Sequence, residues 1–271
     1  MWGRGEDKMR LLKSFAIAFS MYSKIPMPQF KWESEDMKYS ICFFPLIGLL
    51  IGAIMSVFYF VMHYIELPAE TVIPLILVVI PIILTGGIHL DGFMDVSDAL
   101  SSYQTREKKL EILKDPHIGA FAVIRVMVLA ALFFAGLELI MYYAGSGISE
   151  IVVLGLGLCL SRCLSGISVV SFKCAKNEGT LYTFAEGSDK KKCLSILIKE
   201  AGVVMIAMIV IGRFTGAAAV LTALFTFLYY HVRSENEFGG ITGDVAGWFV
   251  CICETCMVLV IGAMAYFYRW L

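Results

Sequence analysis

Charged residues are scarce in this 271-residue chain. Asp, Glu, Lys and Arg make up 17% of it and hydrophobic residues 59%, whereas charged residues are about 25% of an ordinary soluble domain. The mean hydropathy is +0.78. This composition excludes a disordered chain and a coiled coil. A soluble protein this apolar could not cover its surface with polar groups, so the sequence predicts an integral membrane protein.

The sequence also lacks an excess of basic residues and any internal repeat. Its 22 Lys and Arg are balanced by 23 Asp and Glu, for a net charge of −1. Because nucleic acids are bound by basic surfaces, no nucleic-acid partner is expected. The eight cysteines fall mostly in apolar runs and are interpreted as inert small hydrophobes. One integral membrane domain over residues 1–271 is therefore predicted.

Long apolar runs set the expected architecture. A helix needs about 20 apolar residues to cross the hydrocarbon core. The expected spans cover residues 40–65, 70–88, 117–143, 148–172, 193–212, 215–231 and 244–268. The sequence therefore predicts an all-α, polytopic membrane bundle of about seven transmembrane helices, preceded by a cytoplasmic or interfacial segment over residues 1–39.

Lys and Arg are distributed unevenly among the segments that connect these spans. Segments 1–39, 89–116, 173–192 and 232–243 hold 17 of the 22 basic residues. The opposite side holds only Arg213 and Arg269. Because basic residues favour the cytoplasmic side of a membrane, the N-terminus and the polar segments are predicted to be cytoplasmic, and so is any active site they carry.

Three carboxylates stand out in the run TGGIHLDGFMDVSDAL, residues 85–100. Asp91, Asp95 and Asp98 are spaced i, i+4 and i+7, which places them on one face of a helix. Carboxylates arranged in this way repel one another. A divalent cation with a preference for oxygen ligands, such as Mg²⁺, would offset that repulsion, so the three are predicted to be catalytic metal ligands. The alternative is a solvated acidic helix face.

Five further residues near this run are candidates for substrate binding. Gly86 and Gly87 lie at the start of the run, before the aspartates. Asp115 is interpreted either as a fourth acidic ligand or as a helix-end residue before a proline. His89 and His117 are acid–base or phosphate-binding candidates, with satisfied polar side chains as the alternative.

A second cluster, FGGITGDVAG, occupies residues 238–247 at the start of the last span. Gly239, Gly240 and Gly243 would allow close backbone approach, and the following helix start would present free N–H groups to a phosphate. Asp244 is interpreted as a helix N-cap, or as a catalytic residue, either a metal ligand or a base, that meets the first cluster across the bundle. Arg162, inside a span, would contact a phosphate or pair with a carboxylate, and Glu254 is a candidate partner.

Carboxylates, Mg²⁺, backbone N–H groups and arginine together suit displacement at phosphorus. The metal neutralises a diphosphate and its leaving group, while a carboxylate takes the proton of an attacking hydroxyl. The residues therefore predict a membrane transferase that acts on a nucleotide-activated substrate. A CDP-alcohol phosphotransferase of lipid synthesis and a cation transporter are the alternatives.

Several motifs resemble one family, the cobalamin synthases (adenosylcobinamide-GDP ribazoletransferases). The aspartate run GGIHLDGFMDVSDAL carries the resemblance, which is spread over nearly the whole chain in family order. The other matching motifs are YSKIPMP at 22–28, FPLIGLLIG at 44–52, DPHIGAFA at 115–122, LSR at 160–162 and GGITGDVAG at 239–247.

The resemblance implies a reaction that spacing alone does not. Adenosylcobinamide-GDP would react with α-ribazole, or its 5′-phosphate, to give adenosylcobalamin, or its 5′-phosphate, and GMP, with Mg²⁺ required. The family consists of multi-pass proteins of the prokaryotic cytoplasmic membrane, so membrane lipid is an expected partner. A homo-oligomer, or a complex with other cobamide-assembly enzymes, is left open.

Overall fold

The computed structural model describes residues 3–65, 71–144, 147–176 and 178–269. Within these ranges the regular structure is helical, apart from an isolated bridge between Cys174 and Ile241. The predicted all-α class is confirmed. Residues 1–2 of the expected N-terminal segment and residue 70 of the second expected span lie outside the described residues.

The bundle is built around α8 (Ile148–Ser171), and 83% of the most apolar window of this helix is buried inside the protein. Helix α3 (Phe44–Tyr64) packs against it through glycines. A Cβ atom on Gly52 would lie 2.3 Å from the carbonyl oxygen of Gly155, and one on Gly48 would lie 2.2 Å from that of Leu158. Small residues therefore let the two backbones approach closely, as is common where helices associate in lipid.

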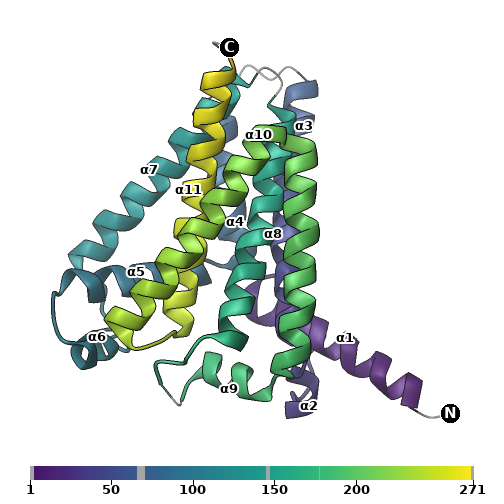
Figure 1. Cartoon of the computed structure of the whole chain (residues 1–271), viewed down its shortest axis with the longest axis vertical. Coiled ribbons are helices and arrows are strands. Elements are labelled where there is room, and N and C mark those ends of the chain that lie inside the picture. The colour runs from purple at the N-terminus through teal and green to yellow at the C-terminus, as the bar shows by residue number, and fades with distance from the viewer. Residues whose placement is uncertain (1–2, 66–70, 145–146, 177, 270–271) are drawn as a thin grey trace.

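Helix α10 (Lys190–Phe238) contains two antiparallel limbs joined at Arg213, where φ is 51° and ψ is −122°. The limbs run in opposite directions side by side (Figure 1). Their contact is so close that a Cβ on Gly216 would lie 1.9 Å from the carbonyl oxygen of Met208. The limbs match the expected spans 193–212 and 215–231.

The second expected span, residues 70–88, contains only the 14-residue helix α4 (Val72–Thr85). Helix α5 (Ile88–Ser101) follows and meets α4 at an angle of 95°. The two residues between them, Gly86 and Gly87, have φ values of 67° and 79°. Only glycine adopts this left-handed conformation without steric cost, so the glycine pair turns the chain and sends α5 across the end of the bundle.

Among the described residues, five helices are long and apolar enough to cross a membrane, or six if α4 and α5 form one broken span. These counts treat α10 as one helix. The long helices other than α3, α8 and α10 are α7 (Ala120–Tyr143) and α11 (Gly243–Arg269). The exact number of crossings, seven by the sequence, stays a prediction.

Short helices gather at one end of the bundle (Figure 1). They are α2 (Ser34–Met37), α6 (Arg106–Ile112) and α9 (Thr180–Gly187), and α1 (Gly3–Tyr22) and the 3-10 helix η1 (Ser40–Phe43) reach the same end. Helix α5 lies there too. The basic segments that the sequence assigns to one side of the membrane therefore lie at the same end of the molecule. That this end faces the cytoplasm stays a prediction.

Candidate functional site

Helix α5 presents its three aspartates away from the bundle core. Asp91 is exposed, and Asp95 and Asp98 are half-buried, whereas Phe93 and Val96 on the other side of the helix are buried. The 3.6-residue helical period explains this division. The three carboxylates therefore share one face of the helix, as the sequence predicted.

Asp244 joins this face from the start of α11. A Cβ on Gly92 would lie 2.7 Å from the Cα atom of Asp244, so the missing side chain lets α5 and α11 touch. Charges on Asp91, Asp98 and Asp244 all repel a charge on Asp95. In the described parts of the chain, no Lys, Arg or His forms an ion pair with any of the four. The cluster therefore has no ion-pair partner in these parts of the chain, although Lys176 attracts the Asp244 carboxylate.

Asp98 has a structural partner that the spacing did not reveal. Its Oδ2 accepts a hydrogen bond of 2.6 Å from the backbone N–H of Gly119, and its Oδ1 accepts one of 2.8 Å from that of Ala122. These N–H groups belong to the start of α7, where a helix has unpaired donors and partial positive charge. Asp98 therefore caps α7 from a different helix.

The carboxylates do not form a complete metal cage. Among the described residues, no three His, Cys, Asp or Glu side chains converge closely enough to hold a metal ion. Mg²⁺ commonly uses one or two protein carboxylates, with water and substrate phosphates filling the remaining positions. The donor chemistry of Asp91, Asp95 and Asp244 therefore fits a metal shared with substrate rather than a closed site.

Two glycines of the second cluster have structural roles. Gly239 ends α10 with a φ of 74°. Gly240, with a φ of 145°, lies so close to the neighbouring segment that a Cβ would be 2.4 Å from the carbonyl oxygen of Lys173. This approach allows Ile241 N–H to donate to Lys173, at 2.8 Å, and Ala175 N–H to donate to Ile241, at 2.9 Å. The pair therefore anchors the turn that precedes α11.

Gly243 is open on the side that faces solvent. No heavy atom lies within 4 Å of the position of a Cβ there. It lines a cavity of about 330 Å³ together with Asp244, Lys114 and Lys176. Burial, and then the charge of Lys114, lower the pKa of Lys176. This cavity lies beside the carboxylate cluster and presents two lysines and the first turn of α11.

Thr242, and not Asp244, caps the side of α11 that packs into the bundle. The Thr242 hydroxyl accepts a hydrogen bond of 3.2 Å from Val245 N–H. The N-cap interpretation of Asp244 is therefore wrong, because the threonine two residues earlier occupies that position. This leaves the Asp244 carboxylate for the cluster. The pattern Thr-x-Asp before an apolar run was the signal that could have identified the cap.

Asp115 and His117 pair with each other. The His117 backbone N–H donates to Asp115 Oδ1 at 3.0 Å, and the imidazole Nδ1 lies 2.6 Å from the same oxygen. These hydrogen bonds lower the pKa of Asp115. The His117 side chain is 89% exposed. The arrangement matches the helix-end interpretation of Asp115, because the residue follows α6 and closes a turn.

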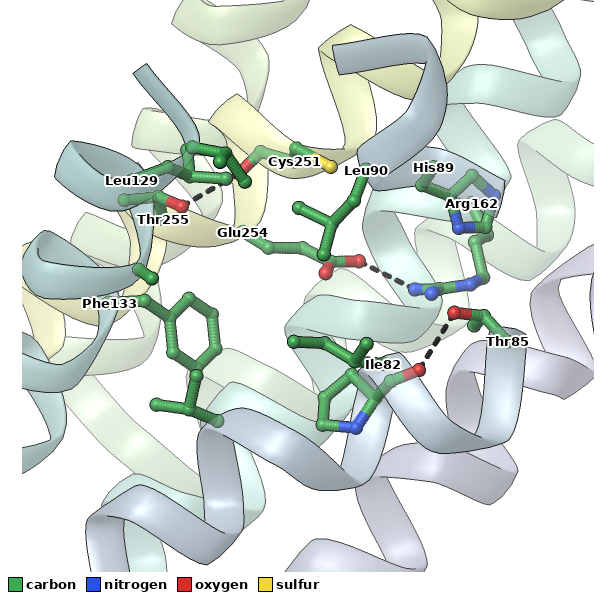
Figure 2. Close-up of a pocket in the computed structure, with 14 residues that line it drawn as sticks. Ile82, Thr85, His89, Leu90, Leu129, Phe133, Arg162, Cys251, Glu254 and Thr255 are labelled. Carbon is green, nitrogen blue, oxygen red and sulfur yellow. Dashed lines mark hydrogen bonds and ion pairs between the residues drawn. The ribbon is translucent and has the colours of Figure 1, made fainter. Parts of the chain in front are cut away.

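His89 of α5 and Arg162 of α8 lie inside the bundle, on the side of α5 opposite the aspartates. The His89 ring packs near Tyr22 and Phe44, with ring centroids 6.4 and 5.7 Å away. Arg162, 1% exposed, forms an ion pair of 2.6 Å with Glu254. Figure 2 shows this pair beside His89 at the wall of a largely apolar cavity. The structure therefore separates both residues from the carboxylate face and makes Glu254 the partner of Arg162.

Lys114 and Lys176 were missed as site residues at the level of sequence. They lie in polar segments whose basic residues indicate only membrane orientation. Nothing in their spacing relates them to Asp244, which is more than 60 positions away. Folding brings them together because the segment around Lys176 forms the bridge to Ile241.

Comparison with known proteins supports the resemblance seen in the motifs. Residues 14–262 match the model of the cobalamin-5-phosphate synthase family. A protein of Lachnoclostridium phytofermentans named adenosylcobinamide-GDP ribazoletransferase is 41% identical over 246 residues, covering 91% of this chain and 92% of that relative.

Proteins with the same name from Clostridium perfringens and Desulfitobacterium hafniense are more distant relatives. They are 34% and 31% identical, over 92% and 96% of this chain and 97% and 100% of theirs. No solved structure matches the chain. The family match covers nearly the whole sequence, and this chain belongs to the cobalamin-5-phosphate synthase family.

Proposed function

We propose that this protein joins GDP-activated adenosylcobinamide to α-ribazole or its 5′-phosphate. A hydroxyl oxygen of the ribazole sugar forms a bond to the phosphorus that carries the cobinamide. The bond from that phosphorus to the diphosphate bridging oxygen breaks, and GMP leaves. The hydroxyl proton passes to a carboxylate of the cluster. The names of the relatives support the substrates, and the family description supports a phosphorylated product.

The cluster of carboxylates that form no ion pair is the observation that carries this proposal. Asp91, Asp95 and Asp244 repel one another and form no ion pair among the described residues, although Lys176 attracts the Asp244 carboxylate. Such a cluster is costly unless a cation is shared among its members. Mg²⁺, held by one or two of these carboxylates together with the substrate diphosphate, would supply charge neutralisation. Asp98 fixes the start of α7 through two hydrogen bonds and adds a fourth negative charge to the cluster.

The cavity beside Asp244 is the proposed place of the nucleotide diphosphate. Lys176 supplies positive charge, as does Lys114, which also pairs with Glu178 on the cavity wall. The first turn of α11 supplies N–H groups at a helix N-terminus. Gly243 keeps this surface free of side chains. Gly239 and Gly240 act indirectly, because they hold the turn that sets the position of Gly243.

The site is proposed to face the cytoplasm, where the nucleotide substrate is made. The distribution of Lys and Arg over the two sides of the bundle supports this orientation. The chain is proposed to act as one membrane domain with lipid around its apolar helices. Cysteine labelling of intact cells at residues 106–114 tests the orientation, and labelling from the outer face would contradict it.

Turnover by the purified protein in detergent tests the reaction itself. Adenosylcobinamide-GDP and α-ribazole 5′-phosphate should give GMP and a corrinoid product in equal amounts, with loss of turnover in EDTA and recovery with Mg²⁺. A protein that uses CDP-activated alcohols instead, or that turns over at full rate in EDTA, would contradict the proposal.

Gly243→Val tests the nucleotide cavity. The added side chain meets open space in the protein, so the fold should survive while the KM for adenosylcobinamide-GDP rises at least about tenfold. The matched control is Gly202→Val, because a Cβ at Gly202 also meets no atom within 4 Å but lies elsewhere, on α10. An unchanged KM in Gly243→Val would place the diphosphate elsewhere.

A further inference from the structure

A second cavity borders the carboxylate cluster at its other end. It has a volume of about 540 Å³ and lies between the end of α1 and the bend that joins α4 to α5. Asp91 lines it, as Asp244 lines the nucleotide cavity, and the two cavities share no described lining residue. The polar side chains on its wall other than Asp91 are Ser20, Ser23, Lys24 and Thr85.

Lys24 is held in this cavity by the backbone around it. Its N–H donates a hydrogen bond of 2.8 Å to the carbonyl of Leu84 at the end of α4. Its aliphatic stem lies over Gly86, where a Cβ would be 2.2 Å from the Lys24 Cε and 2.8 Å from Cγ. Gly86 therefore does more than turn the chain, because its missing side chain makes room for this lysine.

The Lys24 ammonium group has no acidic partner among the described residues, although Asp91 lines the same cavity. Several of the other lysines near this end do have one. Lys13 pairs with Asp36, Lys109 with Glu237, and Lys114 with Glu178. The cavity therefore suits a ligand that brings a negative charge for Lys24 and a hydroxyl donor for the Asp91 carboxylate.

The geometry of in-line displacement indicates which of the two substrates occupies the second cavity. The attacking and leaving oxygens lie on opposite sides of the reacting phosphorus. If GMP leaves toward Lys114 and Lys176, the attacking hydroxyl arrives from the Asp91 side, where the second cavity opens. The family description names a product that still carries a phosphate. That phosphate is therefore a spectator, attached to a sugar oxygen other than the one that attacks.

We propose that the second cavity binds the ribazole substrate and that Lys24 binds its 5′-phosphate. This inference rests on the proposed function and assigns one substrate to each cavity. The phosphate monoester carries a charge of about −1.5 to −2 near neutral pH, whereas α-ribazole has no charge at that position. Lys24 is thus a specificity residue that favours the phosphorylated acceptor, and no bond to its phosphate changes during the reaction.

Lys24→Met is the variant that isolates the charge. Methionine keeps an unbranched apolar stem over Gly86 and removes only the ammonium group. We expect the KM for α-ribazole 5′-phosphate to rise about ten- to a hundredfold, the range of a hydrogen bond to a charged group. The KM for unphosphorylated α-ribazole and that for adenosylcobinamide-GDP should change less than about twofold. Lys24→Arg should retain most of the discrimination.

Lys31→Met is the matched control, because Lys31 is exposed and lines neither cavity. Calorimetric binding of α-ribazole 5′-phosphate to the detergent-solubilised protein provides a second readout that does not depend on turnover. Affinity should fall in Lys24→Met and not in Lys31→Met.

Three results would overturn the inference. Equal losses for both ribazole forms in Lys24→Met would mean that the lysine only supports the α4–α5 bend. A selective loss for adenosylcobinamide-GDP would exchange the two cavities. Unchanged constants for all three substrates would leave Lys24 without a binding role. Failure of the proposed function is distinguishable, because the unaltered protein would then form no product with either ribazole form.

Discussion

The carboxylate of Asp98 should stabilise α7 as well as contribute charge to the site. Two backbone N–H groups at the α7 start donate to it, from Gly119 and Ala122. In Asp98→Ala these donors lose their partner, and water must replace it at a half-buried position. We therefore expect local unfolding of the first turn of α7, with the rest of the bundle intact.

The size of the effect follows from known capping energies. Removing a capping side chain costs about 1 kcal/mol, with a range of roughly 0.5–2. The lost charge at a helix N-terminus adds about 0.3–1 kcal/mol. The sum is about 2 kcal/mol, which corresponds to a roughly 30-fold increase in the open population of this turn.

Hydrogen exchange in nanodiscs measures that population directly. The amides of residues 119–124 should exchange roughly 30-fold faster in Asp98→Ala than in the unaltered protein. Asp91→Ala is the control, because Asp91 is exposed and repels Asp95. Its removal should leave exchange in 119–124 unchanged and relieve repulsion within the cluster, while turnover falls.

One result would refute the reasoning. If Asp98→Ala left exchange in 119–124 unchanged but raised the Mg²⁺ concentration needed for half-maximal turnover, Asp98 would be a metal ligand and not a cap. Asp98→Asn separates the two roles further. Its amide oxygen can still accept one of the two N–H bonds. About half of the free-energy loss, about 1 kcal/mol, should therefore remain, and the amides should exchange roughly fivefold faster than in the unaltered protein.

Three further substitutions test the packing that positions the site. Arg162→Met should destabilise the protein by about 3–5 kcal/mol because it leaves Glu254 buried and unpaired, and adding Glu254→Met should restore most of the melting temperature; a double variant no better than the single would contradict this. Gly52→Val should lower the melting temperature, since its Cβ would lie 2.3 Å from the α8 backbone, whereas Gly202→Val should not. Gly240→Ala should cost about 1–3 kcal/mol, given its φ of 145°; unchanged melting would mean that the bridge is dispensable.

The sequence alone determined the membrane helices, the shared face of the aspartates and the family. Apolar runs long enough to cross a membrane predicted the membrane helices, because burial in lipid depends on segment length and hydropathy and not on distant contacts. The shared face of Asp91, Asp95 and Asp98 followed from the 3.6-residue helical period. The motifs identified the family, since they are distributed along nearly the whole chain.

Only the tertiary structure decided how those residues divide between folding and chemistry. It made Gly86 and Gly87 a 95° bend, which spacing could not reveal because the angle depends on two φ values. It turned His89 toward the bundle and gave Asp98 to the start of α7. It brought Lys24, Lys114 and Lys176 to the aspartates. Such contacts join segments far apart in sequence, so they depend on how helices pack and not on any local pattern.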